Sequence, residues 1–425
     1  MVRYIQPEVE FNFFSFCFCL EEILEDISLI DLIDDKKTWD KYLSYKRDGI
    51  ISDSDLQELE EYVKREGYKR TASQIREGAF PLARKKIISK MSTQKKRTVY
   101  VYPREETITL KLLTHLMLRK YDYLFSDDLY SFRPARKVKD AITRLRKTSG
   151  INGSYAYKAD ISNYFNSVDT DKFLPILKDV LKDDTKLYDL CEMLLSEDKV
   201  LSGDKIISER KGIMAGVPLS SFFANICLME MDKHFEDEGI TYARYSDDII
   251  VFARTEEELD MHVGYIKDML EANGLTINSG KEEYIKPGKK WTFLGISYEN
   301  GTIDIAPASV KKIKGKMRRK ARSLRRWASR HDVDTRKAAK AFIRIFNRKL
   351  LETSDDRDLT WSYWYFPVIN SDNGLKEIDH YAQDCIRFII SGTHTKARYN
   401  IRYDELKEMG YRSLVNEYHK FGNMC

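Results

Sequence analysis

The chain has 425 residues, of which 42% are hydrophobic and 33% are charged, and this balance excludes a disordered chain and a collagen-like one. Six cysteines without a C-x-x-C pair lack the spacing of zinc sites and make a disulfide framework implausible, so we expect a reduced, cytoplasmic location. The formal net charge of +5 is small, but it conceals two regions of strong and opposite charge.

The first 90 residues are expected to form a mostly helical N-terminal extension. Residues 1–60 carry 15 acidic and 6 basic side chains, a net charge of −9. The longest apolar run, residues 11–20 (FNFFSFCFCL), is about half as long as a membrane span and lacks signal-peptide features, so we predict a buried strand or helix and no membrane partner. Residues 53–66 have a helical pattern, with Asp53 as a possible cap and Gly67 as a stop.

The middle of the chain mixes predicted strands and helices. Strand patterns occur at 97–103 and at 154–160, where the second strand ends in Asp160. A helix is predicted at 218–238, two apolar strands around a tight acidic turn at 242–253, and a helix from a capping box at Thr255 to Gly274. Short strands then follow, and helices dominate after residue 305, so the predicted fold class is α+β.

Residues 305–350 carry 17 basic and 2 acidic side chains, a net charge of +15. Apolar side chains recur there at helical spacing, at Val310, Ile313, Met317, Leu324 and Ala328. We interpret this stretch as a helix whose basic face binds nucleic-acid phosphates, and the alternative is a solvated helix face.

The segment Tyr245-Ser246-Asp247-Asp248 places adjacent carboxylates in a tight turn between two apolar strands. Such a pair is costly unless a cation neutralises it. With Asp160 from the strand at 154–160, these aspartates could hold two Mg²⁺ ions. Two metals about 4 Å apart are what in-line phosphoryl transfer needs.

The order of these motifs resembles that of the reverse transcriptases over roughly residues 90–305. The matching segments are YKADISNYF (157–165), GIMAGVPLSSFFANI (212–226), YSDD (245–248), GLTINSGKEEY (274–284) and WTFLGISY (291–298), preceded by RTVYVYPREETI (97–108) and SDDLYSFRPARKVKDA (126–141). The resemblance implies a right-hand polymerase fold with an antiparallel palm sheet and a helical thumb. Its expected domains are the extension at 1–90, fingers at 91–150, a palm at 151–305 with a fingers insertion at about 171–212, and a basic helical thumb and C-terminal region at 306–425.

The resemblance also assigns roles to individual residues. Asp160, Asp247, Asp248 and the Ile161 backbone carbonyl would bind the two metal ions, and Lys281 would be catalytic near the pyrophosphate. The incoming dNTP would contact Arg97, Arg104, Phe165, Ala215 and Gly216, with the Phe165 ring excluding a 2′-hydroxyl. Nucleic acid would contact Tyr245, Arg133, Phe293, Leu294, Gly295, Lys316, Arg318, Arg319 and Arg322. The alternatives are a core aromatic for Phe165 and ordinary surface charge for Lys281 and the two dNTP-binding arginines.

Two features separate this chain from parts of that family. Ala215-Gly216 stands where many reverse transcriptases have Gln-Gly, and the retron-type N-A-x-x-H segment is missing from the sequence. A second acidic tetrapeptide, Phe125-Ser126-Asp127-Asp128, precedes no apolar strand, so we expect Asp127 and Asp128 to be surface or capping residues.

The remaining resemblance is to the stand-alone, defence-associated bacterial reverse transcriptases of the "unknown group" class, which are related to group II intron and retron enzymes. It rests on AGVPLSSFFANI and on the tail at residues 375–418. It implies an RNA-directed DNA polymerase that extends a primer 3′ end and copies a partner non-coding RNA in antiphage defence. The alternatives are a non-catalytic, maturase-like RNA scaffold, a template-independent or protein-primed DNA polymerase, and a polymerase that makes RNA.

Overall fold

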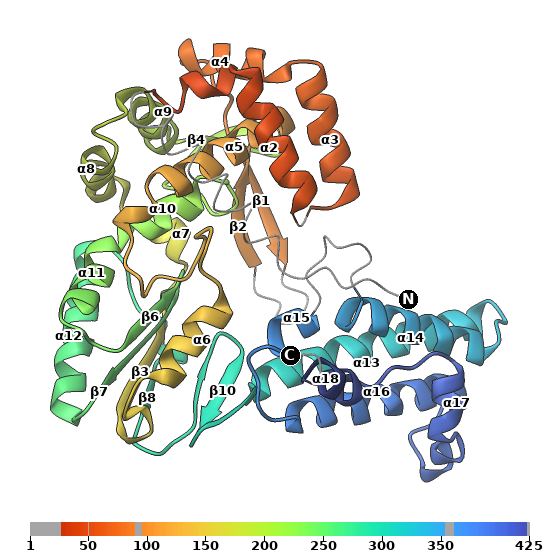
Figure 1. The fold of residues 1–425 in the computed structure, drawn as a ribbon. Coiled ribbons are helices and arrows are strands. Elements are labelled where there is room, and N and C mark those ends of the chain that lie inside the picture. The colour runs from red at the N-terminus through yellow and green to blue at the C-terminus, as the bar shows by residue number, and fades with distance from the viewer. Residues whose placement is uncertain (1–26, 50, 90–95, 353–360, 423–425) are drawn as a thin grey trace.

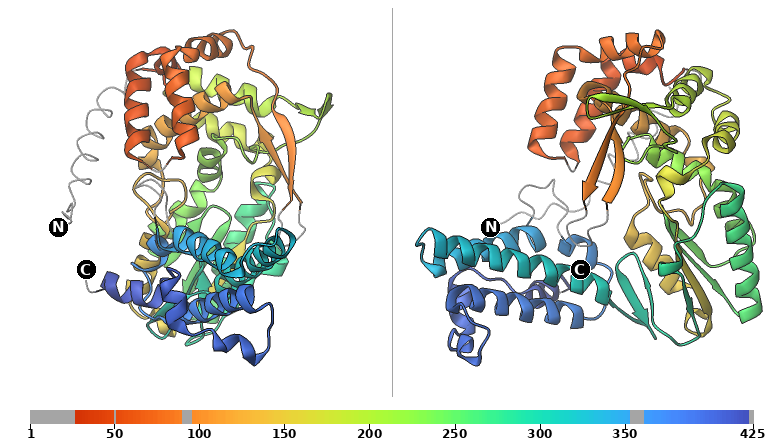
Figure 2. Two further views of the ribbon diagram at one scale, coloured as in Figure 1. Left: turned by 90° about the vertical axis from the view of Figure 1, so that its right-hand side faces the viewer. Right: turned by 180° about the vertical axis from the view of Figure 1, so that it is seen from behind.

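The computed structural model describes residues 27–49, 51–89, 96–352 and 361–422, so the apolar run at residues 11–20 lies outside the described residues. The chain forms three parts: N-terminal helices with a small sheet, a central sheet with covering helices, and a helical C-terminal part (Figure 1). Seen from behind in Figure 2, the C-terminal helices extend to one side of the central sheet.

The N-terminal helices are α2 (Lys36–Asp48), α3 (Asp53–Lys64) and α4 (Gly67–Arg76), and α4 packs on α5 (Arg104–Lys120). Trp39 is fully buried among them and stacks on Tyr68 at 5.5 Å. The helix predicted at 53–66 is confirmed as α3, but its cap is Ser52, whose hydroxyl accepts a hydrogen bond from the Asp55 amide. Gly67 begins α4 instead of ending α3, because Arg65 already closes the last turn of α3.

The small sheet has the order β2-β1-β4-β5 and joins segments that are distant in sequence. Strands β1 (Arg84–Ser89) and β2 (Lys96–Val101) are antiparallel, and β4 (Lys199–Ser202) with β5 (Lys205–Ser208) extends the sheet from the β1 side. Two helices, α8 (Thr170–Val180) and α9 (Thr185–Ser196), precede β4. The predicted strand at 97–103 is therefore the outer strand of this sheet, and the expected domain boundaries stay a prediction.

The central sheet has the order β6-β7-β3-β8, and every neighbouring pair is antiparallel. Its strands are β3 (Tyr155–Asp160), β6 (Tyr242–Tyr245), β7 (Asp248–Ala253) and β8 (Glu283–Ile285). Side chains alternate between two buried faces. Tyr157, Ile249 and Val251 belong to one core, with α10 (Ser220–Cys227), α11 (Met229–Asp237) and α12 (Glu256–Ala272), whereas Ala156, Ile250 and Phe252 belong to a second core with α6 (Val138–Lys147).

Two predicted helices near this sheet had different outcomes. The helix from Thr255 to Gly274 is confirmed as α12, with Thr255 accepting a hydrogen bond from the Glu258 amide at 3.2 Å. The single helix predicted at 218–238 is wrong in detail, because the backbone leaves helical geometry at Leu228 and separates α10 from α11.

A second small sheet of β9 (Trp291–Phe293), β10 (Ile296–Glu299) and β11 (Thr302–Ile305) leads into the C-terminal helices. These helices are α13 (Pro307–Arg330), α14 (Thr335–Leu350), α15 (Trp361–Tyr365), α16 (Asn373–Ser391), α17 (Tyr403–Glu408) and α18 (Leu414–Gly422). Helix α13 packs on α14 and α16. Of the predicted apolar face, Val310, Ile313, Met317 and Ala328 are buried and Leu324 is only half-buried. Ala321, which was not predicted, is also buried on α13.

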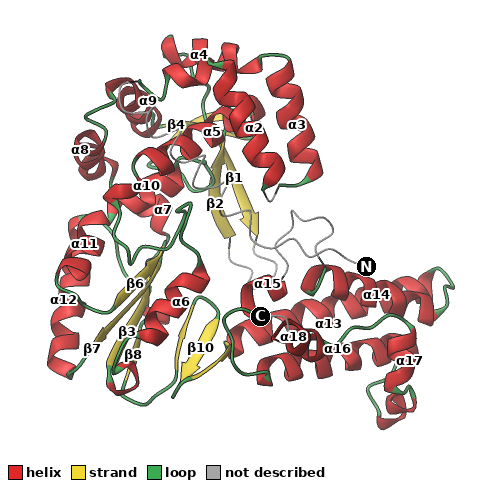
Figure 3. Ribbon diagram, viewed as in Figure 1, coloured by secondary structure: helices red, strands yellow, loops and turns green. Residues whose placement is uncertain are grey.

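The fold class predicted from the sequence, α+β with antiparallel sheets and a helical C-terminal region, is confirmed (Figure 3). Among the residues that the structure describes, no helix is long and apolar enough to cross a bilayer.

Candidate active site

Three carboxylates meet at one end of the central sheet. Strands β3 and β7 pair in a register that places Asp160 opposite Asp248. Strand β6 pairs with β7 so that Tyr245 also lies opposite Asp248, which leaves Ser246 and Asp247 as a two-residue turn. Ser246 has a φ of 58°, in the left-handed region that such hairpin turns require. The Ile161 amide donates to the Asp247 carbonyl at 2.9 Å and fixes the turn against the end of β3.

The electrostatics of this end of the sheet favour a positive ligand. Burial, together with the neighbouring carboxylates of Asp247 and Asp160, raises the pKa of Asp248 to about 6. Burial and the Asp160 carboxylate also raise the pKa of Asp247, which the Lys281 and Arg97 cations partly counteract. The carboxylates of Asp160, Asp247 and Asp248 thus lie at the same end of the sheet, partly shielded from water, and the nearby cations only partly balance their negative charge.

Two side chains from the segment after α12 contact Asp160 directly. The Lys281 ammonium, in the short 3-10 helix η4 (Ser279–Lys281), forms an ion pair with the Asp160 carboxylate. The Asn278 backbone amide donates to the Asp160 carbonyl at 2.8 Å, and the Asn278 side-chain amide lies 3.4 Å from Asp160 Oδ1. Lys281 was predicted at this site, whereas Asn278 was missed although it lies in the same motif segment.

The carboxylates are suited to a divalent cation by chemistry, although their side chains do not converge on one point. In the described ranges, no three His, Cys, Asp or Glu side chains are arranged closely enough to hold a metal ion. Carboxylate oxygens are nevertheless the ligands that Mg²⁺ prefers, and a cation would offset the burial and the repulsion that together raise the pKa of Asp248. The Ile161 carbonyl accepts no hydrogen bond from any described residue, so its oxygen is available beside Asp160.

A buried ion pair supports the turn from behind, and the sequence reading missed it. The side chains of Arg244 and Asp232 are both 0% exposed. Arg244 Nε donates to Asp232 Oδ1 at 2.7 Å, and the Tyr242 hydroxyl donates to the same oxygen at 2.8 Å. Arg244 Nη1 donates to the Ser246 carbonyl at 3.2 Å, so the pair holds the turn that presents Asp247 and Asp248. The sequence signal that could have indicated this pair is the arginine directly before Tyr245-Ser246-Asp247-Asp248, within a strand that is otherwise apolar.

Phe165 lies where β3 has passed into α7 (Tyr164–Ser167), and its half-buried ring belongs to an aromatic group. The ring contacts Phe132 with centroids 6.3 Å apart, and Phe132 contacts Tyr245 at 6.5 Å. Both contacts link Phe165 to the turn that carries Asp247. Phe132 has a φ of 59° and is 38% exposed, and the sequence reading did not single it out.

The loop that contains Ala215 and Gly216 packs against β2. The Tyr100 amide donates to the Ala215 carbonyl at 2.7 Å, and the Ala215 amide donates to Asn166 Oδ1 at 3.0 Å. Gly216 has a φ of 100°, and a Cβ there would lie 3.0 Å from the Tyr100 carbonyl oxygen, so only glycine fits. The loop therefore presents backbone next to Phe165, and Asn166 is a further residue that the sequence reading missed.

The three predicted arginines of the first half of the chain have different surroundings. Arg97 is exposed on β2 and near enough to Asp247 to lower its pKa. Arg104 forms an ion pair with Glu58 of α3.

Arg133 is only 5% exposed and uses all five N–H donors inside the protein, on Asp122, Ser126 and Leu129. It therefore stabilises the loop before α6, and no donor remains for the predicted interaction with nucleic acid.

The predicted nucleic-acid residues of the second half lie on the hairpin between β9 and β10 and on α13. Phe293 is 2% exposed, so its side chain is part of the core, while Leu294 and Gly295 form the turn. A Cβ at Gly295 would lie 2.9 Å from the Tyr365 hydroxyl, which shows that the turn is pressed against α15. On α13 the four predicted basic residues are all exposed, and no described acidic side chain forms an ion pair with them; they are Lys316, Arg318, Arg319 and Arg322.

The second acidic tetrapeptide is structural, as expected, but Asp128 is not a surface residue. Asp128 is 1% exposed and pairs with Arg144, and its carbonyl accepts from the Arg244 amide at 3.0 Å. The segment thus lies along the edge of β6, where Leu129 bridges Arg244. Asp127 is exposed and pairs with Arg136, as predicted for the surface.

Comparison with known proteins places this site inside a recognised family region. Residues 88–298 match the family described as reverse transcriptase (RNA-dependent DNA polymerase). A putative enzymatic polyprotein of Cassava vein mosaic virus is 42% identical over 83 residues, which cover 20% of this chain and 12% of the polyprotein.

Solved telomerase structures also align with the chain. Apo telomerase from Candida tropicalis is 13% identical with a TM-score of 0.48, covering 78% of this chain and 60% of that one. Telomerase from Candida albicans in complex with a TWJ fragment of telomeric RNA is 13% identical with a TM-score of 0.43, covering 79% and 65%. The chain thus spans less than two thirds of each of these relatives.

Proposed function

We propose, from the premise that residues 88–298 form a reverse transcriptase domain, that the protein is an RNA-directed DNA polymerase that extends a primer 3′ end with dNTPs. The observation that carries the proposal is the register of the central sheet, which places Asp160 opposite Asp248 and Asp247 in the adjoining turn. All three carboxylates lie within the matched region, which favours catalysis over the scaffold alternative.

Asp160, Asp247, Asp248 and the Ile161 carbonyl would hold the divalent cations, two Mg²⁺ in our proposal. When bound, these ions supply positive charge that offsets the negative charge of the attacking 3′-oxygen and the triphosphate. In the reaction, the 3′-oxygen forms a bond to the α-phosphorus while the bond to pyrophosphate breaks.

The chain's own groups would orient the substrates. Arg97 and Lys281 lie beside the carboxylates and would contact the triphosphate, and Lys281 Nζ would give a proton to the leaving pyrophosphate. The Phe165 ring would lie under the sugar, and the backbone at Ala215 and Gly216 would line the nucleotide site next to it. The exposed basic face of α13 would bind the template–primer duplex by its phosphates.

The more specific role that we propose is the copying of a partner non-coding RNA in bacterial antiphage defence. It is supported by the resemblance of residues 215–226 and of the tail at 375–418 to that class of enzymes. Sequencing the RNA and DNA that copurify with the protein tests it, together with phage plating on cells that express the wild-type chain or Asp247→Asn. DNA complementary to one abundant RNA supports the role, and equal plating on both strains contradicts it.

Primer extension tests the enzymatic proposal directly. Purified protein, a primed RNA template, dNTPs and Mg²⁺ should give DNA products, whereas Asp248→Asn should give none. A matched control is Asp127→Asn, which alters the exposed aspartate of the other tetrapeptide. Equal synthesis by the wild type and Asp248→Asn would contradict the proposal.

A further inference from the structure

A cavity in the N-terminal half gathers positive charge outside the carboxylate site. It has a volume of about 610 Å³ and lies between α2, α3, α5 and the loop that contains Phe132. This size is within the range of small-molecule sites. The cations that line it are Lys46 from α2 and Lys111 and Arg119 from α5, and three aromatic rings join them, those of Tyr42, Tyr45 and Phe132.

These three cations have no acidic partner among the described residues. The other charged groups of the lining are accounted for: Glu58 pairs with Arg104, and Arg133 pairs with Asp122. Asp55 accepts a hydrogen bond from the Ser52 hydroxyl at 2.7 Å and is the only lining acid in the described part that forms no ion pair. The cavity therefore holds a surplus of positive charge.

The crowding of these cations contributes to lowered pKa values of Lys46 and His115. Burial lowers the pKa of Lys46, and the charges of Lys111 and Arg119 lower it further. Burial, Arg119 and Lys46 lower the pKa of His115 to about 2, so its ring is neutral and accepts from Arg119 Nη1 at 2.8 Å. Like charges held together without compensation destabilise the folded chain, and a bound anion would offset them.

The aromatic rings supply flat apolar surfaces next to the cations. The Arg119 guanidinium lies 4.8 Å from the centre of the Tyr45 ring, and Lys46 Nζ lies 5.2 Å from that of Tyr42. Phe132 is 38% exposed, and its backbone adopts the left-handed conformation, which turns the loop at this residue. Tyr42 is buried, so the rings on which a nucleic-acid base could stack are the half-buried Tyr45 and the exposed Phe132.

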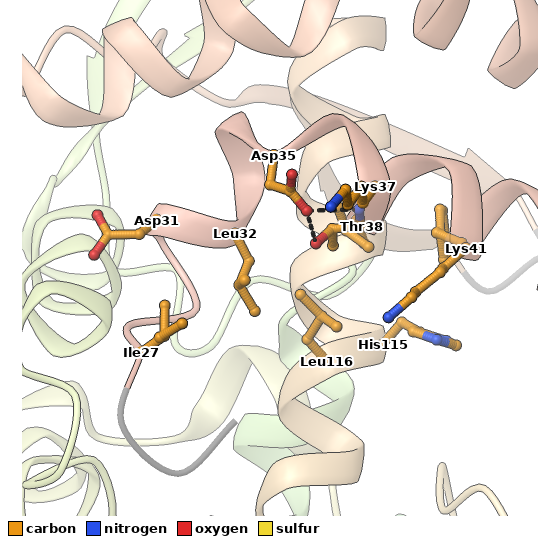
Figure 4. Close-up of a pocket in the computed structure, with 11 residues that line it drawn as sticks. Ile27, Asp31, Leu32, Asp35, Lys37, Thr38, Lys41, His115 and Leu116 are labelled. Atoms are coloured by element: carbon orange, nitrogen blue, oxygen red, sulfur yellow. Dashed lines mark hydrogen bonds between the residues drawn. The ribbon is translucent and has the colours of Figure 1, made fainter. Parts of the chain in front are cut away.

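A neighbouring cavity lacks such an excess of cations over acids in its lining. The smaller cavity of about 380 Å³ shares Tyr42 and His115 with it (Figure 4). Its lining has as many acids as lysines, Asp31 and Asp35 against Lys37 and Lys41. Asp31 pairs with Lys186 outside the lining, and Figure 4 shows Asp35 bonded to Thr38, which lies in the first turn of α2.

We propose that the larger cavity binds one nucleotide unit, with its phosphate on Lys46, Lys111 and Arg119 and its base against Phe132 and Tyr45. The unit is either a free nucleotide or one residue of a single-stranded RNA. Phe132 also contacts Phe165 and Tyr245, so a strand that leaves the carboxylate site would pass this cavity. The RNA source rests on the proposed function, whereas nucleotide binding here needs no synthesis.

Binding assays in EDTA separate this cavity from the metal-dependent site. The probes are ADP, followed by calorimetry, and a short fluorescein-labelled oligouridylate, followed by anisotropy. Lys46→Gln with Arg119→Gln should weaken binding of the ligand at least ten-fold and lower the log–log salt slope for the oligonucleotide by about 0.7 for each phosphate that is no longer neutralised. The matched control is Lys64→Gln with Lys147→Gln, two exposed lysines outside the cavity with the same loss of charge.

The outcomes separate the two sources. Loss of ADP binding alone supports a free nucleotide, and loss of oligouridylate binding alone, or of both, supports a nucleotide of an RNA strand. Unchanged binding of both probes, or equal losses in the control, overturns the proposal. Lys111→Gln changes one exposed side chain and keeps the test decisive if the double variant unfolds. Primer extension on each variant is recorded separately, so that failed synthesis with intact binding counts against the proposed function alone.

Discussion

Replacing Arg244 with methionine should separate the stability of the central sheet from the positioning of its acidic turn. The substitution leaves Asp232 charged, fully buried and without its ion-pair partner. Breaking a buried pair in this way costs about 3–5 kcal/mol of unfolding free energy. The Ser246 carbonyl also loses its donor, and displacement of the turn by about 1 Å would lower kcat on the order of a hundred-fold.

A double variant distinguishes these two effects. Asp232→Asn together with Arg244→Met leaves no buried charge, and the asparagine oxygen can still accept from the Tyr242 hydroxyl. Its unfolding free energy should therefore fall by only about 1–2 kcal/mol, the value of the missing hydrogen bonds.

The assay is urea unfolding followed by circular dichroism, with primer extension on the same preparations. Activity should stay low in the double variant even though its stability largely returns. Full activity in the double variant, or an Arg244→Met protein as stable as the wild type, would refute the reasoning.

Three further predictions concern the duplex grip, sugar choice and pH. Changing four exposed cations of α13 to glutamine should weaken template–primer binding; they are Lys316, Arg318, Arg319 and Arg322. The log–log salt slope should fall by about 0.7–0.9 for each phosphate that is no longer neutralised, and an unchanged slope would mean that this side of α13 is a solvated face. Phe165→Ala should raise the kcat/KM for an NTP relative to the matched dNTP by roughly ten- to a hundred-fold, because overlap of the ring with a 2′-hydroxyl costs about 1–3 kcal/mol. A constant ratio with full dNTP activity would mean that Phe165 is a core aromatic. Lowering the pH from about 7 to about 5 should lower the free energy of unfolding, with a contribution from His115 that approaches about 1.4 kcal/mol per pH unit. The pKa of His115 is lowered in the folded state, so only the unfolded chain takes up the proton. His115→Gln should remove this contribution, and an identical slope in both proteins would contradict it.

The sequence was sufficient for the features that depend on local pattern. Alternation and turn chemistry predicted β3, the strands β6 and β7, and the turn at Asp247, and the capping box predicted the start of α12. The expectation that Asp160 lies with Asp247 agrees with the sheet register, although the roles of these residues stay a proposal.

Features that depend on tertiary contacts were not predictable in the same way. Arg133 and Arg244 look like surface cations in the sequence, yet each is buried because a distant carboxylate and several backbone carbonyls satisfy its donors. Asp128 was expected to be a surface or capping residue, yet it is buried and pairs with Arg144. The break at Leu228 has no glycine or proline to mark it, so the 3.6-residue pattern continued through it.

Measuring primer extension and RNA binding together on Asp160→Asn and Asp247→Asn tests whether the carboxylates of the central sheet carry out RNA-templated DNA synthesis. Both variants should lose DNA synthesis while their affinity for template RNA stays within about two-fold of the wild type, because phosphate contacts from basic side chains dominate that affinity. Substantial synthesis by either variant would contradict the assignment of these carboxylates.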